Sequence, residues 1–391
     1  MQSAGVYLSI PFCRQKCTYC NFASEAHAPA LLPGYLRALE REIAERARFW
    51  AAAGIPASED MPVDSIYLGG GTPGMLRPEE LASLLGTVRA CFSVPGDAEI
   101  TLEASPENAT RENAAAWAYC GVNRVSMGVQ SMVTQELRAV GRRHSAETVA
   151  DAFAALRYAG IANISVDLIA GLPHQTTESW QSSLEALLRL APPHFSVYML
   201  EVDEDSRLGR EILSGGSRYT REAVPSDEQV ADQFSRASER LRAAGYVHYE
   251  ISNFARPGRH SRHNEKYWTG APYFGFGVEA HSYDGRRRWA NTDSLTDYMA
   301  ALEKGVAPLA QHKTLSVQEK LEERLFLGLR RLEGLRLSDL EAEFRASVRQ
   351  KYAEQIGEFC RTGWMETDGD HLCLTERGLL FSNEIFASFL A

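Results

Sequence analysis

Short runs of apolar residues alternate with longer amphipathic stretches along the first two-thirds of the chain. The short runs are typical of buried strands, and they span residues 7–10, 65–68, 99–103, 124–129, 163–169 and 195–200. The stretches between them repeat apolar residues at helical spacing, over 35–50, 78–91, 109–119, 146–158, 177–190 and 227–244. Six such alternations predict an α/β fold with a parallel sheet, either doubly wound or an incomplete barrel.

Residues that a buried core would not favour follow the ends of these predicted strands. They are Cys13, Cys17, Cys20, Gly70, Gly71, Thr72, Glu103, Gln130 and Asp167. The carboxyl ends of the strands of a barrel meet at one mouth, and the chemistry of such folds takes place there. The pattern therefore favours an incomplete barrel with a site at this mouth.

The last third of the chain has a different pattern. An extended run at 247–251 precedes residues 253–292, which have little periodicity and are rich in Gly, His, Arg and aromatic side chains. Such a segment is usually a functional lid or a linker, and its aromatic content predicts that it is ordered. Helical patterns return at 319–332, 337–344, 348–360 and 376–389, with a hairpin pattern at 364–374.

Helices followed by a hairpin resemble a winged-helix fold, so we predict three parts for the chain. A barrel that carries the site is expected over 1–252, a connecting segment over 253–313, and a small winged-helix-like α+β domain over 314–391. Winged-helix domains often bind DNA, but residues 332–344 contain few basic side chains. We therefore expect no nucleic-acid partner.

The composition is that of an ordinary globular protein. The 391 residues are 45% hydrophobic and 24% charged, with a net charge of −10. The acidic balance argues against a broad nucleic-acid surface, although Arg286, Arg287 and Arg288 form a local basic patch. We find no secretory signal and no run near the ~20 apolar residues of a membrane span, so a reduced, cytoplasmic location is expected.

Three of the seven cysteines form a C-x3-C-x2-C sequence at Cys13, Cys17 and Cys20. Three thiolates can hold three irons of a [4Fe–4S] cluster and leave the fourth iron open, whereas electron-transfer clusters take four cysteines. A zinc site with a distant fourth ligand is the alternative that the spacing leaves open. The other cysteines lie among apolar neighbours and are expected to be packing residues; they are Cys91, Cys120, Cys360 and Cys373.

The cysteine spacing, with Tyr19 before the last cysteine, resembles the radical SAM signature, in which the open iron binds S-adenosylmethionine (SAM). The glycine run of Gly69 to Pro73 lacks the spacing of a phosphate loop or a dinucleotide fingerprint. It matches instead the glycine motif whose backbone pairs with the SAM amino group. Glu103 is a candidate for contact with the ribose hydroxyls or the ammonium of SAM, with a salt-bridged carboxylate as the structural alternative.

Three more polar residues are candidates for the same ligand. The Gln130 amide could bond the ribose, and Arg142 could pair with the SAM carboxylate through its planar guanidinium, with Arg143 as its rival. Asp167 interrupts a buried apolar run, so its carboxylate must have a partner.

Taken together, the motifs resemble the oxygen-independent coproporphyrinogen III oxidase-like family of radical SAM proteins. They are YxxIPFCxxxCxYCNF, YLGGGTP, EASP, SMGVQSM, GR, DLIAGLP and HNxxYW, and they extend over about residues 5–390. The resemblance implies a partial (β/α)6 TIM-like radical SAM barrel with a small C-terminal winged-helix-like α+β domain.

The resemblance also implies roles for single residues. Cys13, Cys17 and Cys20 would hold the [4Fe–4S] cluster. SAM would be bound by Tyr7, Gly70, Gly71, Thr72, Glu103, Gln130, Arg142 and Asp167. A further SAM contact of the family aligns less closely, near Glu201.

The family has two branches, an oxidase and a haem chaperone, and two features favour the chaperone. The oxidase has a further cysteine two positions after the third, where this chain has Phe22, and it has a longer segment before its cluster. The HNxxYW motif of the chaperone branch is intact at 263–268. Oxidative decarboxylation of coproporphyrinogen III is the alternative function, and a radical SAM tRNA modifier is disfavoured by the acidic balance.

Haem would be the cargo of such a chaperone. His263 is suited to the role of axial ligand, and Asn264, Tyr267 and Trp268 complete the candidate haem site. His260 and His281 compete with His263 for ligation. The propionates could meet Arg262 or the arginines at 286–288.

The partners implied by the resemblance are haem, haem-acceptor proteins such as respiratory ones, and an electron donor such as flavodoxin or ferredoxin. Contact with a membrane surface, the oligomeric state and the cleavage of SAM during function are left open by the sequence.

Overall fold

Six parallel strands form the centre of the fold, which the computed structural model describes for residues 3–20, 25–26, 30–56, 61–202, 204, 206–214 and 223–390. The strands are β1 (Ala4–Ile10), β4 (Val63–Gly70), β5 (Glu99–Ala104), β6 (Arg124–Gln130), β7 (Asn163–Ala170) and β8 (His194–Met199). They pair in chain order. Each new parallel strand is added on the same side of the previous one. Right-handed crossovers then place all the connecting helices on one face of the sheet, so the fold is a partial (β/α)6 barrel and not a doubly wound sheet.

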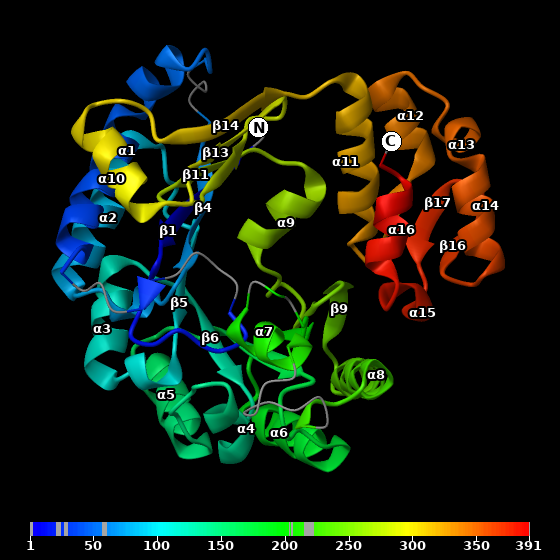
Figure 1. Ribbon diagram of the computed structural model, residues 1–391, viewed down its shortest axis with the longest axis horizontal. Coiled ribbons are helices and arrows are strands. Elements are labelled where there is room, and N and C mark those ends of the chain that lie inside the picture. The colour runs from blue at the N-terminus through cyan, green and yellow to red at the C-terminus, as the bar shows by residue number, and fades with distance from the viewer. Residues whose placement is uncertain are drawn as a thin grey trace.

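The helices that follow these strands lie outside the curved sheet (Figure 1). They are α1 (Leu32–Ala52), α2 (Pro78–Cys91), α3 (Arg111–Cys120), α5 (Ala146–Tyr158), α6 (Thr177–Leu190) and α8 (Asp227–Ala243), and all six were predicted. The sequence analysis missed the shorter α4 (Thr134–Ala139) and α7 (Arg207–Leu213), as well as the 3-10 turns η1 (Pro73–Met75) and η2 (Pro106–Asn108). These elements have too few turns for a periodic pattern to stand out.

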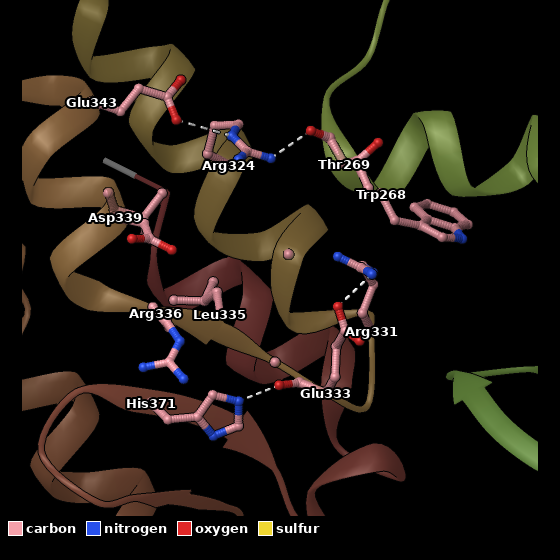
Figure 2. Close-up of a pocket in the computed structure, with 13 residues that line it drawn as sticks. Trp268, Thr269, Arg324, Arg331, Glu333, Leu335, Arg336, Asp339, Glu343 and His371 are labelled. Carbon is pink, nitrogen blue, oxygen red and sulfur yellow. Dashed lines mark hydrogen bonds and ion pairs between the residues drawn. The ribbon is translucent and has the colours of Figure 1, made fainter. Parts of the chain in front are cut away.

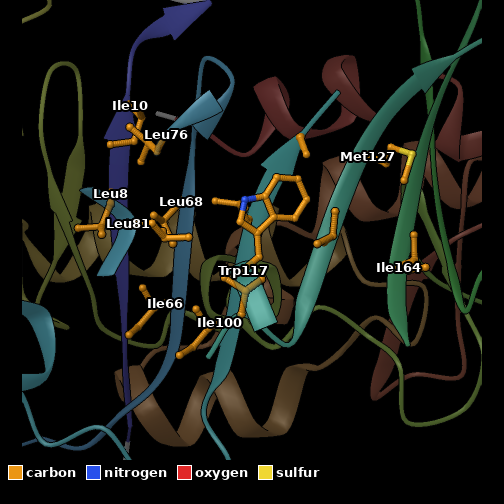
Figure 3. Close-up of a cluster of buried hydrophobic side chains, with 14 of the residues drawn as sticks. Leu8, Ile10, Ile66, Leu68, Leu76, Leu81, Ile100, Trp117, Met127 and Ile164 are labelled. Atoms are coloured by element: carbon orange, nitrogen blue, oxygen red, sulfur yellow. The ribbon is translucent and has the colours of Figure 1, made fainter. Parts of the chain in front are cut away.

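The main hydrophobic core fills the space between the sheet and these helices (Figure 3). Leu8 and Leu68 from neighbouring strands and Leu81 from α2 are fully buried in it. Trp117 of α3 is 2% exposed and is one of the largest side chains of this core. The alternating strands and helices therefore pack against one another across a shared core, as the sequence pattern predicted.

Both edges of the sheet are extended by strands that run largely antiparallel to their neighbours. Beside β1 lies the parallel β11 (Tyr273–Phe276), and beyond it β12 (His281–Tyr283), β13 (Arg287–Asn291) and β14 (Leu309–Thr314). Beside β8 lie β10 (Asn253–Ala255) and then β9 (Val247–Glu250). The non-periodic segment thus contains several short strands, and its separation from the barrel as a part of its own stays a prediction.

Two helices belong to this later segment. Helix α10 (Leu295–Glu303) packs against α1, and α9 (Arg262–Thr269) contacts β1 and β4. The Glu99 carboxylate accepts hydrogen bonds from the backbone nitrogens of Arg262 and His263, at 3.3 and 3.2 Å. A carboxylate at the first turn of a helix satisfies its unpaired donors, so Glu99 fixes the start of α9 against β5.

The C-terminal domain has a hydrophobic core of its own. It contains α11 (Val317–Leu329), β15 (Leu335–Arg336), α12 (Leu337–Phe344), α13 (Val348–Lys351), α14 (Ala353–Arg361), β16 (Met365–Thr367), β17 (His371–Leu374), α15 (Glu376–Leu379) and α16 (Ser382–Ser388). The predicted hairpin is confirmed, with β16 antiparallel to β17. The predicted helices at 348–360 and 376–389 are each divided into two shorter helices.

Across the described ranges, no helix combines the length and the apolar content that crossing a membrane requires.

A buried carboxylate joins α1 to the strands beside β1. Glu42 accepts hydrogen bonds from the Tyr298 hydroxyl at 2.6 Å, the Asn291 amide at 2.7 Å and the Gly277 backbone nitrogen at 2.8 Å. Glu42 is 5% exposed, and this burial raises the pKa of its carboxyl to about 7.

We expect Glu42→Gln to destabilise the protein. At pH 8 the carboxylate accepts from all three donors, whereas a glutamine amide has one acceptor oxygen and leaves a donor unsatisfied. The free energy of unfolding should fall by about 1–3 kcal/mol. Urea denaturation measures it, with Glu45→Gln as the control because Glu45 forms only exposed ion pairs. Equal effects of the two changes would contradict the prediction.

Candidate functional site

The three signature cysteines lie on the loop that follows β1. Cys13 ends β2 (Phe12–Cys13), which pairs with β3 (Glu25–Ala26). The Thr72 hydroxyl donates to Cys13 Sγ at 3.5 Å, and the Cys20 backbone nitrogen donates to the Cys17 carbonyl at 3.3 Å. All three side chains are half-buried thiols on the wall of one cavity of about 480 Å³. Phe22, which takes the place of the oxidase's further cysteine, lies outside the described residues.

This cavity brings together nearly all the residues predicted to form the site. Its walls include Cys13, Cys17, Cys20, Gly70, Gly71, Thr72, Glu103, Gln130, Arg142 and Asp167. Glu201, the more weakly aligned candidate, also lines it, whereas the rival Arg143 is exposed and does not. Tyr7 instead lines a neighbouring cavity of about 310 Å³, which shares Gly70 with the first.

The glycine run allows the loop after β4 to lie against the cysteine loop. A Cβ on Gly71 would lie 2.6 Å from the Phe12 carbonyl oxygen and 2.7 Å from that of Ile10. Gly70 has a φ of 99°, in the region that glycine adopts without strain. The Thr72 nitrogen donates to the Phe12 carbonyl at 2.9 Å. Glycine is therefore required here by close approach of two backbones as well as by conformation.

Two carboxyl groups near the ends of β5 and β7, the strands on either side of β6, line the cavity. Glu103 accepts a 2.8 Å hydrogen bond from the Tyr67 hydroxyl, and burial raises the pKa of Glu103 to about 7. Asp167 accepts from the Ser126 hydroxyl at 3.3 Å, and burial raises the pKa of Asp167 to about 6. The partner expected for Asp167 is thus a hydroxyl. A cationic ligand would favour the ionised form of both groups and lower their pKa values.

Gln130 and Arg142 present polar atoms that have no hydrogen-bond partner in the described part of the chain. They are Gln130 Oε1 and Arg142 Nε, both buried. Gln130 has a φ of 67°, at a register shift between β6 and β7. Arg142 Nη2 donates to the Tyr19 hydroxyl at 3.1 Å. Burial raises the pKa of that hydroxyl, so it stays neutral and accepts this bond.

The residues of the cavity fit a [4Fe–4S] cluster with SAM. Three thiols can supply three cluster ligands, and a glycine turn exposes backbone to the same space. The unpartnered amide oxygen and guanidinium nitrogen can serve an amino, hydroxyl or carboxylate group. Among the described residues, no set of three His, Cys, Asp or Glu side chains is placed to hold a single metal ion.

Three further residues of the cavity were not predicted to form the site, although Tyr19 belongs to the cysteine motif. Tyr198 lies at the end of the sixth parallel strand, Ser126 lies on β6 beside Asp167, and Tyr19 lies within the cysteine loop. Strand-end position was the signal available for Tyr198. The hydrogen bonds that involve Tyr19 and Ser126 depend on contacts between distant elements.

The ring of His263 on α9 is 1% exposed, and hydrogen bonds engage both of its nitrogens. Nδ1 lies 3.1 Å from the Ser65 hydroxyl, and Nε2 lies 2.9 Å from the Tyr267 hydroxyl. Burial lowers the pKa of this imidazole to about 3, so the ring is neutral. Its role as an iron ligand stays a prediction, and in this arrangement ligation would require one of these bonds to break.

The other histidines named as haem ligands have different surroundings. His260 stacks on the Tyr249 ring at a centroid distance of 4.1 Å, and Nδ1 lies 3.4 Å from Glu265. His281 is exposed and lines the neighbouring cavity together with Tyr7. Of the two candidates, His281 is therefore the one that faces open space.

The arginines suggested for the propionates are partly engaged. Arg288 forms a bidentate pair with Glu323 at 2.7 and 2.8 Å, and Arg287 pairs with Asp284 at 3.0 Å. Arg262 donates to the Asp97 carbonyl at 2.6 Å. These contacts leave Arg286 as the exposed member of the basic patch.

Comparison with protein families identifies two matching regions. Residues 7–187 match the Radical SAM superfamily, and residues 315–381 match the HemN C-terminal domain.

Curated relatives match over nearly their whole length. The heme chaperone HemW of Bacillus subtilis is 32% identical over 100% of this chain and 99% of its own. The heme chaperone HemW of Mycobacterium tuberculosis H37Rv is 34% identical over 100% of this chain and 95% of its own. That of Escherichia coli K12 is 30% identical, over 99% and 98% of the two chains.

A solved structure has the same fold. The coproporphyrinogen III oxidase HemN of Escherichia coli, a radical SAM enzyme, aligns with a TM-score of 0.85 over 99% of this chain and 90% of its own. At 24% sequence identity, this likeness shows the fold alone.

We expect Gly71→Ala to damage the cysteine loop and with it the cavity. The new Cβ would force backbone apart at Phe12 and Ile10, at a cost of about 1–3 kcal/mol in stability. Iron and sulfide per chain after anaerobic reconstitution should fall. Gly86→Ala is the matched control, because a Cβ there meets nothing within 4 Å. Full iron loading of the Gly71 variant would show that the close approach is dispensable.

Proposed function

Because the chain belongs to the heme chaperone HemW family of radical SAM proteins, we propose that it binds haem and delivers it to haem-dependent proteins. The main support for this proposal is the match over whole chains to several heme chaperones. The signature residues also line one cavity. The likeness to the coproporphyrinogen III oxidase supports the fold alone and does not favour the oxidase reaction over haem delivery.

The proposal assigns roles to the cavity residues. Cys13, Cys17 and Cys20 would hold the cluster, and a bound cluster would supply the one-electron chemistry that can cleave SAM. The amino group of SAM meets the backbone of the glycine turn, and the ribose meets Glu103 and Gln130. The guanidinium of Arg142, which lines the same cavity, would pair with the SAM carboxylate.

The remaining assignments have weaker support. Asp167 and Thr72 line the same cavity and complete the SAM site. Tyr7 reaches SAM only through the region of Gly70, because it lines the adjoining cavity.

Haem is proposed to bind at the HNxxYW helix. His263, Asn264, Tyr267 and Trp268 are the candidate residues, and the His263 ring becomes a ligand once the Tyr267 hydroxyl releases Nε2. Haem-acceptor proteins, respiratory ones among them, and a flavodoxin or ferredoxin as electron donor are the partners that this function requires. A location in the cytoplasm accords with it.

We expect the reconstituted protein not to convert coproporphyrinogen III to protoporphyrinogen. The assay is anaerobic, with SAM and a reductant, and the products are separated by chromatography. A Cys17→Ser variant should lose the cluster absorbance, which verifies that the wild-type preparation is loaded. Sustained turnover by the wild type and not by Cys17→Ser would replace the chaperone by the oxidase.

A haem titration followed by absorbance tests the proposed ligand. His263→Ala should weaken haem binding about tenfold or more, because an axial bond is lost, and should shift the Soret band. Tyr267→Phe should not weaken it, since the change removes the hydroxyl that bonds Nε2.

His281→Ala is the control, because His281 is the exposed rival. Unchanged binding by His263→Ala combined with loss by His281→Ala would transfer the ligand role to β12.

A further inference from the structure

The C-terminal domain joins the barrel through backbone contacts between β9 and the end of α11. The Ile251 nitrogen donates to the Arg330 carbonyl at 3.1 Å, and the Leu332 nitrogen donates to the Tyr249 carbonyl at 3.2 Å. The Arg330 side chain extends from this junction, and its guanidinium carbon lies 4.3 Å from the centre of the Trp268 ring on α9. Arg330 and Trp268 thus form one stacked pair at the boundary of the two parts.

Two hydrogen-bond donors of this pair are unsatisfied. Arg330 Nε and Trp268 Nε1 are buried and have no hydrogen-bond partner among the described residues. The nearest carboxylate is that of Glu250, whose Oε2 lies 3.8 Å from Arg330 Nη2 and itself accepts no hydrogen bond from them. Each buried donor left unpaired costs about 1–3 kcal/mol, so hydrogen-bond acceptors for these two donors are expected.

The Glu250 carboxylate forms a long ion pair with Arg330, but no hydrogen bond joins the two side chains. It is completely buried, and it accepts hydrogen bonds from the Ser252 nitrogen at 3.0 Å and from the Asn253 side chain. Burial lowers the pKa of the Arg330 guanidinium, which is the direction that an anionic ligand would reverse.

Trp268 also lines an outer pocket of about 400 Å³ that contains several arginines (Figure 2). Its arginines already have partners. Arg324 donates to the Thr269 carbonyl at 2.6 Å and lies 3.5 Å from Glu343, while Arg331 pairs with Glu333. Arg336 lies 3.5 Å from Asp370. Of the described arginines at this junction, Arg330 is therefore the one with an unsatisfied buried nitrogen, and it lies beside the Trp268 ring.

The position of the pair relates it to the site cavity. Tyr198 lines the cavity of the signature cysteines and is 43% exposed. Burial, together with the nearby Asp167 and Glu250 carboxylates, raises the pKa of the Tyr198 hydroxyl, so Tyr198 lies within electrostatic reach of Glu250. A ligand held by the pair would lie between the HNxxYW helix, the C-terminal domain and the rim of that cavity.

We propose that Arg330 and Trp268 together bind a carboxylate of a ligand with a flat apolar body. A guanidinium and an indole N–H both donate, as a carboxylate requires, and the aromatic ring offers an apolar surface beside them. Identification of this carboxylate as a haem propionate rests on the proposed function.

Absorbance titrations of the full chain with haem and with haem dimethyl ester, whose propionates are uncharged, test this inference. The wild type should bind haem about 10- to 100-fold more tightly than the ester, the range of a charge-assisted hydrogen bond. Arg330→Gln should lose this preference by weakening haem binding while leaving the ester unaffected. Trp268→Phe keeps the ring, removes one donor, and should lose part of the preference.

Arg331→Gln is the matched control, because Arg331 is the neighbouring arginine with 27% side-chain exposure against 26% for Arg330. It should bind both ligands as the wild type does. Thermal melts verify that the variants fold. If Arg330→Gln does not fold, the ligand preference of Trp268→Phe decides the question.

Three outcomes overturn the inference and differ in what they leave standing. Equal binding of haem and ester by the wild type, or an Arg330→Gln protein with full preference, rejects the carboxylate site while haem binding survives. A preference lost in Arg331→Gln and kept in Arg330→Gln moves the carboxylate to the outer pocket. A wild type that binds neither ligand removes the proposed function and this inference together.

Discussion

The site depends on how closely the turn after β4 approaches the loop after β1. Parallel pairing sets Gly70 opposite Ile10, and from there Gly71 lies against the Ile10 and Phe12 carbonyls where no side chain could fit. The Thr72 nitrogen and hydroxyl then hold Phe12 and Cys13. The cysteine loop has little regular structure of its own, so its shape is imposed by a neighbouring strand. The cysteine motif and the glycine motif are thus both required for the close packing of these two loops.

Much of this arrangement could be predicted from the sequence, because it follows from strand ends. Long periodic helices and apolar strands fix the order of the barrel, and polar residues such as Glu103 and Asp167 meet because parallel strands end at one mouth. Positions that depend on contacts between distant segments do not follow from a local pattern. Tyr7 lies on β1 but lines the adjoining cavity, and the strands of residues 253–292 are too short for a period to be recognised.

The surroundings of the HNxxYW helix could not be predicted from its sequence either. Its sequence suggests a ligand for iron, yet the His263 ring lies 3.1 Å from the position of a Cβ on Gly5 and bonds Ser65 and Tyr267. Glu99 fixes the start of the helix. These partners come from three different strands and the helix itself, which no local pattern displays. In this structure the motif anchors α9 to β1, β4 and β5, and Trp268 at its end reaches the C-terminal domain.

The two outer strands of the twelve-stranded sheet are protected by different means. Strand β14 presents Gln311, His312 and Lys313 to solvent, and polar and charged side chains discourage a second chain from adding there. At the opposite border, β9 is covered by main-chain bonds to Arg330 and Leu332. The C-terminal domain therefore covers this edge of the sheet. In a chain shortened before α11, the backbone groups of β9 that now bond Arg330 and Leu332 would be unpaired. Such an exposed edge strand promotes aggregation by pairing with a second chain, which the domain prevents.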